Sequence, residues 1–192
     1  MELNTSKETI TNKSAIKIKK RDGRLEDLDI DKIHFVVEEA CEGLAGVSSS
    51  QIEINANIQF YDGMTTKEVQ QILVRSANDL ISLEAPNYQY AAARLLSYDV
   101  RKEAHGQYEY MPLLKLIVRN SKAGVYDRGI VEQYNKVEIK KMNTWIKRER
   151  DLDFTYAGLR QVVDKYLVQD RSSGDLFETP QDMYMMIAAT LF

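Results

Sequence analysis

The chain has 192 residues, of which 44% are hydrophobic and 29% are charged. This length and composition fit one large or two small globular domains, and they exclude disordered and collagen-like classes. The 26 Lys and Arg residues against 29 Asp and Glu residues give a net charge of −3, without the basic excess typical of a sequence-independent DNA binder. A single Cys excludes an internal disulfide, and neither a signal pattern nor a membrane-spanning apolar run is present. We therefore expect a cytoplasmic protein with no direct nucleic-acid partner and no membrane partner.

The N-terminal end of the chain predicts a flexible tail followed by a hairpin. Residues 1–15 are polar and show no periodicity, which is typical of a loose terminus. Strict alternation of apolar and basic residues predicts a short strand over 16–19. The pair Asp22-Gly23 predicts a tight turn, after which the chain returns as a second strand over 24–29.

Four helices are predicted after the hairpin, each with an apolar face at spacings of three and four. Asp29 or Asp31 caps the first, and Thr65 with Glu68 matches a capping box at the start of the third. Cys41 lies on the apolar stripe of the first helix and is interpreted as a small buried hydrophobe. Pro86 suits the first turn of the fourth. The predicted ranges are 33–44, 48–60, 65–81 and 86–103.

The pair His105-Gly106 ends the fourth helix, so a domain boundary is predicted near 105–110. The remainder reads as mostly helical, with a small hairpin between 165–168 and 176–177. The segment 187–192 is apolar, which predicts either that it docks onto another polypeptide or that the chain is a fragment of a larger protein. The predicted helices of this half are 111–122, 138–150, 156–167 and 182–192.

The segment around the predicted hairpin is the most informative for chemistry. Lys20 and Arg21 flank a Gly-containing turn, and a helix begins about eight residues later. Turn amides, cationic side chains and a helix N-terminus together suit a polyphosphate. Glu26 cannot favour phosphate, but its carboxylate can accept a hydrogen bond from an exocyclic amine or a ribose hydroxyl. An exposed hairpin with ordinary surface cations is the alternative on residue types alone.

Other classes of site find little support in the sequence. The two His residues, His34 and His105, have no metal-ligand spacing with Cys or carboxylates, so no metal site is predicted. No Walker loop, no Gly-x-Gly-x-x-Gly motif and no nucleophile–base pair is found. The tyrosines near 88–110 are interpreted as packing between helices.

Four motifs in a fixed order resemble the N-terminal part of the large (alpha) subunit of class Ia ribonucleoside-diphosphate reductase, of the phage and enterobacterial type. The similarity covers residues 16–192. It implies a mostly helical α+β fold: an ATP-cone over 16–106, with a small β-hairpin on a four-helix unit, and then a helical segment over 107–192 that precedes a ten-stranded catalytic barrel. The motifs are Lys20-Arg21-Asp22-Gly23, Asp31-Lys32-Ile33-His34, Ile58 to Gly63, and Ala85 to Leu95.

The resemblance also implies a regulatory site for ATP or dATP, with Mg²⁺. By resemblance, Lys20, Thr66 and Lys102 contact phosphates, and the segment from Glu26 to Lys32 contacts the base and ribose. The implied effector-binding set is Lys20, Glu26, Asp27, Leu28, Asp29, Ile30, Asp31, Lys32, Thr66 and Lys102. A second set implied near the effector is Arg21, Ile33, Gln70, Tyr98 and Asp99.

The catalytic parts of the family lie beyond the matched segment, so the chain alone is expected to be inactive. The family reaction is the thioredoxin- or glutaredoxin-dependent reduction of ribonucleoside diphosphates to deoxyribonucleotides for DNA synthesis. The resemblance implies two partners: a polypeptide carrying the catalytic barrel, and a small subunit holding a di-iron centre and a tyrosyl radical. It also implies an oligomer formed through the large subunit. A naturally split bacteriophage subunit and a truncation fit equally, and a phage origin would place the protein in the host cytoplasm.

Two substitutions bear on regulation. Many dATP-inhibited members of the family carry His where this chain has Gln70 and Asp99. By resemblance both positions lie near the effector phosphates, and because a carboxylate facing phosphate repels it, weak coupling to dATP inhibition is expected. The alternative is that both substitutions are neutral changes at the surface.

Two other functions remain open from the sequence. One is a free-standing nucleotide-binding regulator built on an ATP-cone, although such repressors carry a four-Cys zinc ribbon and this chain has one Cys. The other is a nucleotide-independent helical interaction protein.

Overall fold

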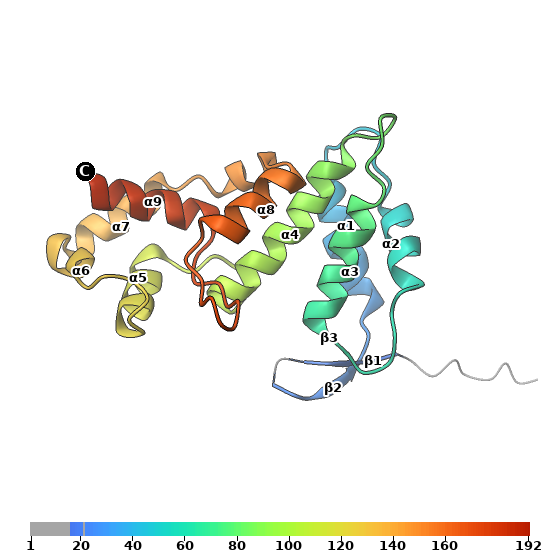
Figure 1. Cartoon of the computed structure of the whole chain (residues 1–192), viewed down its shortest axis with the longest axis horizontal. Helices are drawn as coiled ribbons and strands as arrows, with labels where there is room; N and C mark the ends of the chain where they lie inside the picture. The colour runs from blue at the N-terminus through green and yellow to red at the C-terminus, as the bar shows by residue number, and fades with distance from the viewer. Residues whose placement is uncertain (1–15, 21) are drawn as a thin grey trace, which may run out of the picture.

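The computed structural model describes residues 16–20 and 22–192 (Figure 1). The predicted tail over 1–15 and the candidate residue Arg21 lie outside the described residues. The described chain is mostly helical with one small sheet at its N-terminal end, which confirms the predicted α+β class. None of its described helices is both long and apolar enough to cross a membrane.

The sheet has three strands in the order β2-β1-β3. Strands β1 (Lys17–Lys19) and β2 (Leu25–Asp27) form the predicted antiparallel hairpin, and Gly23 at its turn has a φ of +85°, which favours glycine. The third strand, β3 (Met64–Thr65), was not predicted and pairs with β1 in parallel. Two residues are too few to show a period in the sequence, so only the pairing with β1 reveals this strand.

Four helices follow in the predicted order. Asp29 caps the first, and Thr65 and Glu68 form the predicted capping box of the third. The fourth begins after Pro86, which lies in the preceding turn, and ends at the left-handed Gly106. The helices are α1 (Ile30–Cys41), α2 (Ser49–Asn57), α3 (Thr66–Asn78) and α4 (Tyr88–His105). Of these, α1 and α3 rise from the sheet, and α4 runs obliquely toward the C-terminal half (Figure 1).

The C-terminal half is helical as expected, with one prediction wrong. The predicted charged helix over 138–150 ends at Trp145, and a separate 3₁₀ helix follows. The break has a physical cause: Arg148 and Asp151 turn inward to partners on the last helix, which a continuous helix would not allow. The elements are α5 (Leu113–Lys122), α6 (Gly129–Gln133), α7 (Lys136–Trp145), η1 (Arg148–Asp153), α8 (Tyr156–Lys165) and α9 (Pro180–Leu191).

The hairpin predicted between α8 and α9 is reduced to one antiparallel bridge between Gln169 and Leu176. We call this segment the 169–177 loop. Its ends are tied by backbone hydrogen bonds, including Phe177 N–H to the Val168 carbonyl. Short α6 was not predicted, and α9 begins with a capping box between Thr179 and Asp182.

The hydrophobic core of α1–α4 continues into the C-terminal half. Leu159 and Val163 of α8 and Met183 of α9 are buried in the same cluster as the N-terminal helices, and α8 packs against α4. A second cluster lies among α5, α6, α7 and α9. The predicted boundary between a domain over 16–106 and a segment over 107–192 stays a prediction. The two parts share one hydrophobic core through the packing of α8 and α9 on the N-terminal helices.

Candidate functional site

The register of the small sheet places two predicted phosphate contacts side by side. Lys19 of β1 is paired with Thr65 of β3, and β3 runs directly into α3. Lys20 therefore leaves the sheet beside Thr66, the first residue of α3. The third strand thus explains why residues 46 positions apart in the chain meet at one edge of the sheet.

A cavity of about 720 Å³ opens at this edge, and we call it the seam cavity. Both halves of the chain line it, because α5 and the 169–177 loop approach the sheet edge from the other side. Its volume lies within the range of small-ligand pockets. Four cationic side chains face two carboxylates across it, so its charge favours an anion. The polar lining is Lys19, Lys20, Thr65, Thr66, Lys67, Glu103, Arg119, Asn120 and Asp175.

A second, smaller cavity of about 80 Å³ lies between α1, α3 and α4, and we call it the inner cavity. Thr66 and Lys67 line both cavities, so the two lie on either side of the first turn of α3. The inner cavity holds a few water molecules at most, so a nucleotide cannot enter it whole. Its lining includes five of the predicted residues: Thr66, Gln70, Tyr98, Asp99 and Lys102.

The acidic residues of β2 and of the start of α1 form ion pairs with nearby lysines. Glu26 lies 3.2 Å from Lys20 Nζ, and Asp27 lies 2.5 Å from Lys17 Nζ. Asp29 caps α1 and lies 2.9 Å from Lys32 Nζ. The hydrogen bonds from Lys32 lower the pKa of Asp29, and the same contact raises the pKa of Lys32. These residues lie at the surface, where a ligand can exchange partners with them.

The other predicted residues divide between surface and core. Asp31 and Ile30 are exposed in the first turn of α1. Leu28 packs against the core, and Ile33 is buried in it, so the side chain of Ile33 lines neither cavity. The Gln70 amide donates to the Leu95 carbonyl at 2.8 Å, which links α3 to α4.

Tyrosines close the far side of the inner cavity. The Arg101 guanidinium lies over the rings of Tyr98, Tyr108 and Tyr110 at 5.0, 4.3 and 4.8 Å. The Tyr108 hydroxyl donates to Glu39 of α1. These contacts place the tyrosines in packing between α4 and the segment that follows it, and Tyr108 of that segment covers the inner cavity.

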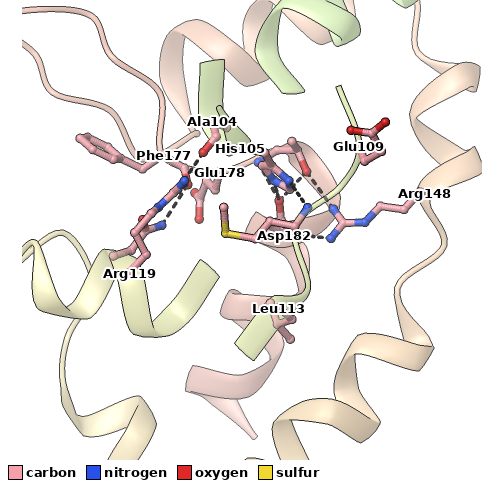
Figure 2. A network of polar contacts seen from close by, with 12 residues as sticks. Ala104, His105, Glu109, Leu113, Arg119, Arg148, Phe177, Glu178 and Asp182 are labelled. Atoms are coloured by element: carbon pink, nitrogen blue, oxygen red, sulfur yellow. Dashed lines mark hydrogen bonds and ion pairs between the residues drawn. The ribbon is translucent and has the colours of Figure 1, made fainter. Parts of the chain in front are cut away.

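Two polar clusters join the halves of the chain (Figure 2), and the first of them borders the seam cavity. Arg119 donates to the Ala104 carbonyl at 2.7 Å and to the Phe177 carbonyl at 3.2 Å, so it ties α5 to the end of α4 and to the 169–177 loop. In the second cluster, Asp182 receives hydrogen bonds from His105 and Arg148.

Sequence reasoning missed the residues that the C-terminal half contributes. Arg119, Asn120 and Asp175 reach the seam cavity only through the packing of α5 and the 169–177 loop. Lys67 was also missed, although its place in the first turn of a capped helix is a signal that points to anions.

Both halves of the chain are similar to parts of known proteins. The family profile described as ATP cone domain matches residues 16–103, and the profile described as ribonucleotide reductase, all-alpha domain matches residues 152–192. Ribonucleoside-diphosphate reductase 1 subunit alpha of Escherichia coli is 45% identical over 91% of this chain. The subunits alpha of Haemophilus influenzae and Enterobacteria phage T4 are 41% and 40% identical over 94% and 92% of it. The chain spans between 23% and 24% of the length of these three relatives.

Proposed function

Because this chain carries the ATP cone and the all-alpha domain of ribonucleoside-diphosphate reductase alpha subunits and corresponds to their N-terminal region, we propose that it is the nucleotide-sensing part of such an enzyme. The observation that carries the proposal is the meeting of Lys20, Thr66 and Lys67 at the seam cavity. ATP or dATP, with Mg²⁺ on its phosphates, is the proposed effector.

The proposed binding mode places the phosphates at the start of α3. Lys20 and Lys102 supply charge to them, and the Thr66 hydroxyl and the N-terminus of α3 supply hydrogen bonds. Glu26 and the residues up to Lys32 receive the base and ribose. Lys20 must leave Glu26 for this to occur, and such partly exposed ion pairs are worth only about 0–1 kcal/mol. A polyphosphate therefore replaces the pair at little cost.

The proposed reaction of the whole enzyme is the reduction of ribonucleoside diphosphates to their deoxy forms. Cys41 is the only cysteine of the sequence, and burial raises the pKa of its thiol to about 11. It is therefore protonated at neutral pH and unsuited to thiol redox chemistry. We propose that the redox cysteines come from a catalytic barrel outside these residues, and that a di-iron small subunit in the cytoplasm supplies the radical.

Replacing Lys20 and Lys102 together by alanine tests the site. Each charge-assisted phosphate contact is worth roughly 1.5–3 kcal/mol, so each replacement should weaken ATP binding ~10-fold or more in calorimetry. Lys165→Ala, an exposed cation at the end of α8, is the matched control and should leave the affinity unchanged. Unchanged ATP affinity in the double variant would show that the site is misplaced. Glu26→Ala should weaken ATP binding, because the base and ribose lose an acceptor. It should not weaken the binding of inorganic triphosphate, because the change frees Lys20 for the phosphates.

Asp99→His tests the charge of the inner cavity. Asp99 lines this cavity together with Thr66 and Lys102, so its carboxylate repels a phosphate bound at the start of α3. Two like charges ~4 Å apart cost about 1 kcal/mol in water, so the variant should bind dATP about 5-fold more tightly in calorimetry. Asp79→His, an exposed position at the other end of α3, is the control. Equal gains at both positions would mean that net charge alone is responsible.

A further inference from the structure

We propose that Lys67 is a phosphate-binding residue of the effector site and that Glu103 competes with the effector for it. Effector binding is then transmitted to the 169–177 loop through Glu103. This inference rests on the proposed function and adds to it a residue and a route of regulation.

Lys67 is placed to meet a ligand from either cavity. It is the second residue of α3, and it lines both the seam cavity and the inner cavity. Its side chain is 47% exposed, yet its Nζ lies 2.9 Å from a carboxylate oxygen of Glu103. Glu103 is the one carboxylate paired with Lys67 among the described residues, so an anion in the seam cavity competes with a single negative charge for this cation.

Glu103 connects α4 with two other parts of the chain. One of its oxygens accepts from Lys67, and the other accepts from the Leu176 backbone N–H at 3.2 Å. Its side chain is only 11% exposed. Leu176 is buried, and the neighbouring Phe177 carbonyl accepts from Arg119 (Figure 2). The carboxylate is thus the point where α3, α4 and the 169–177 loop meet.

A triphosphate changes this balance. Its charge exceeds that of one carboxylate, so it draws Lys67 away from Glu103. A mostly buried carboxylate that loses its cation is costly to keep in place. The cost is relieved when Glu103 turns toward solvent, and that movement releases the Leu176 N–H. The bound and free states therefore differ in the anchoring of the 169–177 loop, which is the differential interaction that coupling between two sites requires.

The test is ATP calorimetry on the full chain with three variants. Lys67→Met should weaken binding ~5- to 10-fold, and Glu103→Gln should strengthen it ~3-fold or more, because an amide keeps the hydrogen bond to Leu176 but holds Lys67 less strongly. The double variant should bind like Lys67→Met, since Glu103 acts through Lys67. Glu84→Gln, an exposed carboxylate before α4, is the control for charge. Circular dichroism checks that each variant is folded.

Hydrogen exchange at Leu176 gives a second measurement. ATP should speed exchange of this amide in the unmodified chain and leave it unchanged in Lys67→Met and Glu103→Gln. The inference is overturned if Glu103→Gln fails to strengthen ATP binding, or if it strengthens binding equally in the Lys67→Met background. It is also overturned if ATP leaves the exchange rate of the Leu176 amide unchanged in the unmodified chain. ATP binding that is weakened by Lys20→Ala but unchanged in both Lys67→Met and Glu103→Gln would overturn this inference and leave the proposed function standing. Absence of ATP binding to the unmodified chain would overturn the proposed function and this inference together.

Discussion

Asp182→Ala is expected to destabilise the chain by about 3–5 kcal/mol, the usual cost of removing one partner of a buried ion pair. Asp182 is fully buried and receives hydrogen bonds from Arg148 at 2.6 Å and His105 at 2.9 Å (Figure 2). The Met111 N–H donates to His105 Nδ1, so His105 Nε2 carries the proton that Asp182 accepts. Thr179 adds the cap of α9 through two further bonds. Without the carboxylate, the donors of His105 and Thr179 remain buried and unsatisfied, and Arg148 loses its ion pair.

Urea unfolding at pH 7 measures this loss. Asp164→Ala is the control, because Asp164 forms an exposed pair with Arg160 on one helix and its removal should cost no more than about 0.5 kcal/mol. A loss for Asp182→Ala as small as that of the control would show that the network contributes little.

The lowered pKa of Asp182 predicts that the fold loses stability in acid. Burial alone would raise the pKa of Asp182, but the hydrogen bonds from His105 and Arg148 outweigh it and hold this pKa well below its ordinary range. A lowered folded pKa stabilises the fold above the unfolded pKa of 3.8, and that contribution is lost as the pH falls below about 4.

The N-terminal fold could be predicted because its signals are local. Apolar spacing predicts α1 and α3, and the capping box at Thr65 fixes the start of α3 within one residue. Strand β3 could not be predicted, because two residues carry no pattern and their pairing with β1 is a tertiary contact. That pairing is what brings Lys20 to Thr66, so the sequence predicted these two residues as candidates but not the geometry that places them side by side.

The rest of the site depends on packing between segments far apart in the chain. Glu103 and Leu176 are 73 positions apart, and no motif predicts their hydrogen bond. The predicted helix over 138–150 was wrong for a related reason. Arg148 and the neighbouring Asp151 are directed into the interior by partners on α9, which the local sequence does not reveal.

Asp151 is the second residue for which we expect a large effect, and its effect on stability has the opposite sign to that of Asp182. It is 1% exposed, and its Oδ1 accepts from Gln181 at 2.9 Å, while Oδ2 has no hydrogen-bond partner among the described residues. Burial raises the pKa of Asp151 to about 6. The hydrogen bond from Gln181 and the nearby charges of Arg148 and Arg101 lower this pKa, but by less than burial raises it. Asp182 is the other carboxylate that faces it.

The sign follows from the proton count. Between pH 3.8 and about 6 the folded chain keeps a proton on Asp151 that the unfolded chain has released. Stability from this group therefore falls as the pH rises through that window, by about 3 kcal/mol in total at 1.36 kcal/mol per pKa unit. Asp151→Asn cannot titrate, so its stability relative to the unmodified chain should rise by most of this amount between pH 4 and pH 7. Asp153→Asn, exposed in the same turn, should show no such change. Urea unfolding curves for the chain and Asp151→Asn that stay parallel across this range would contradict the prediction.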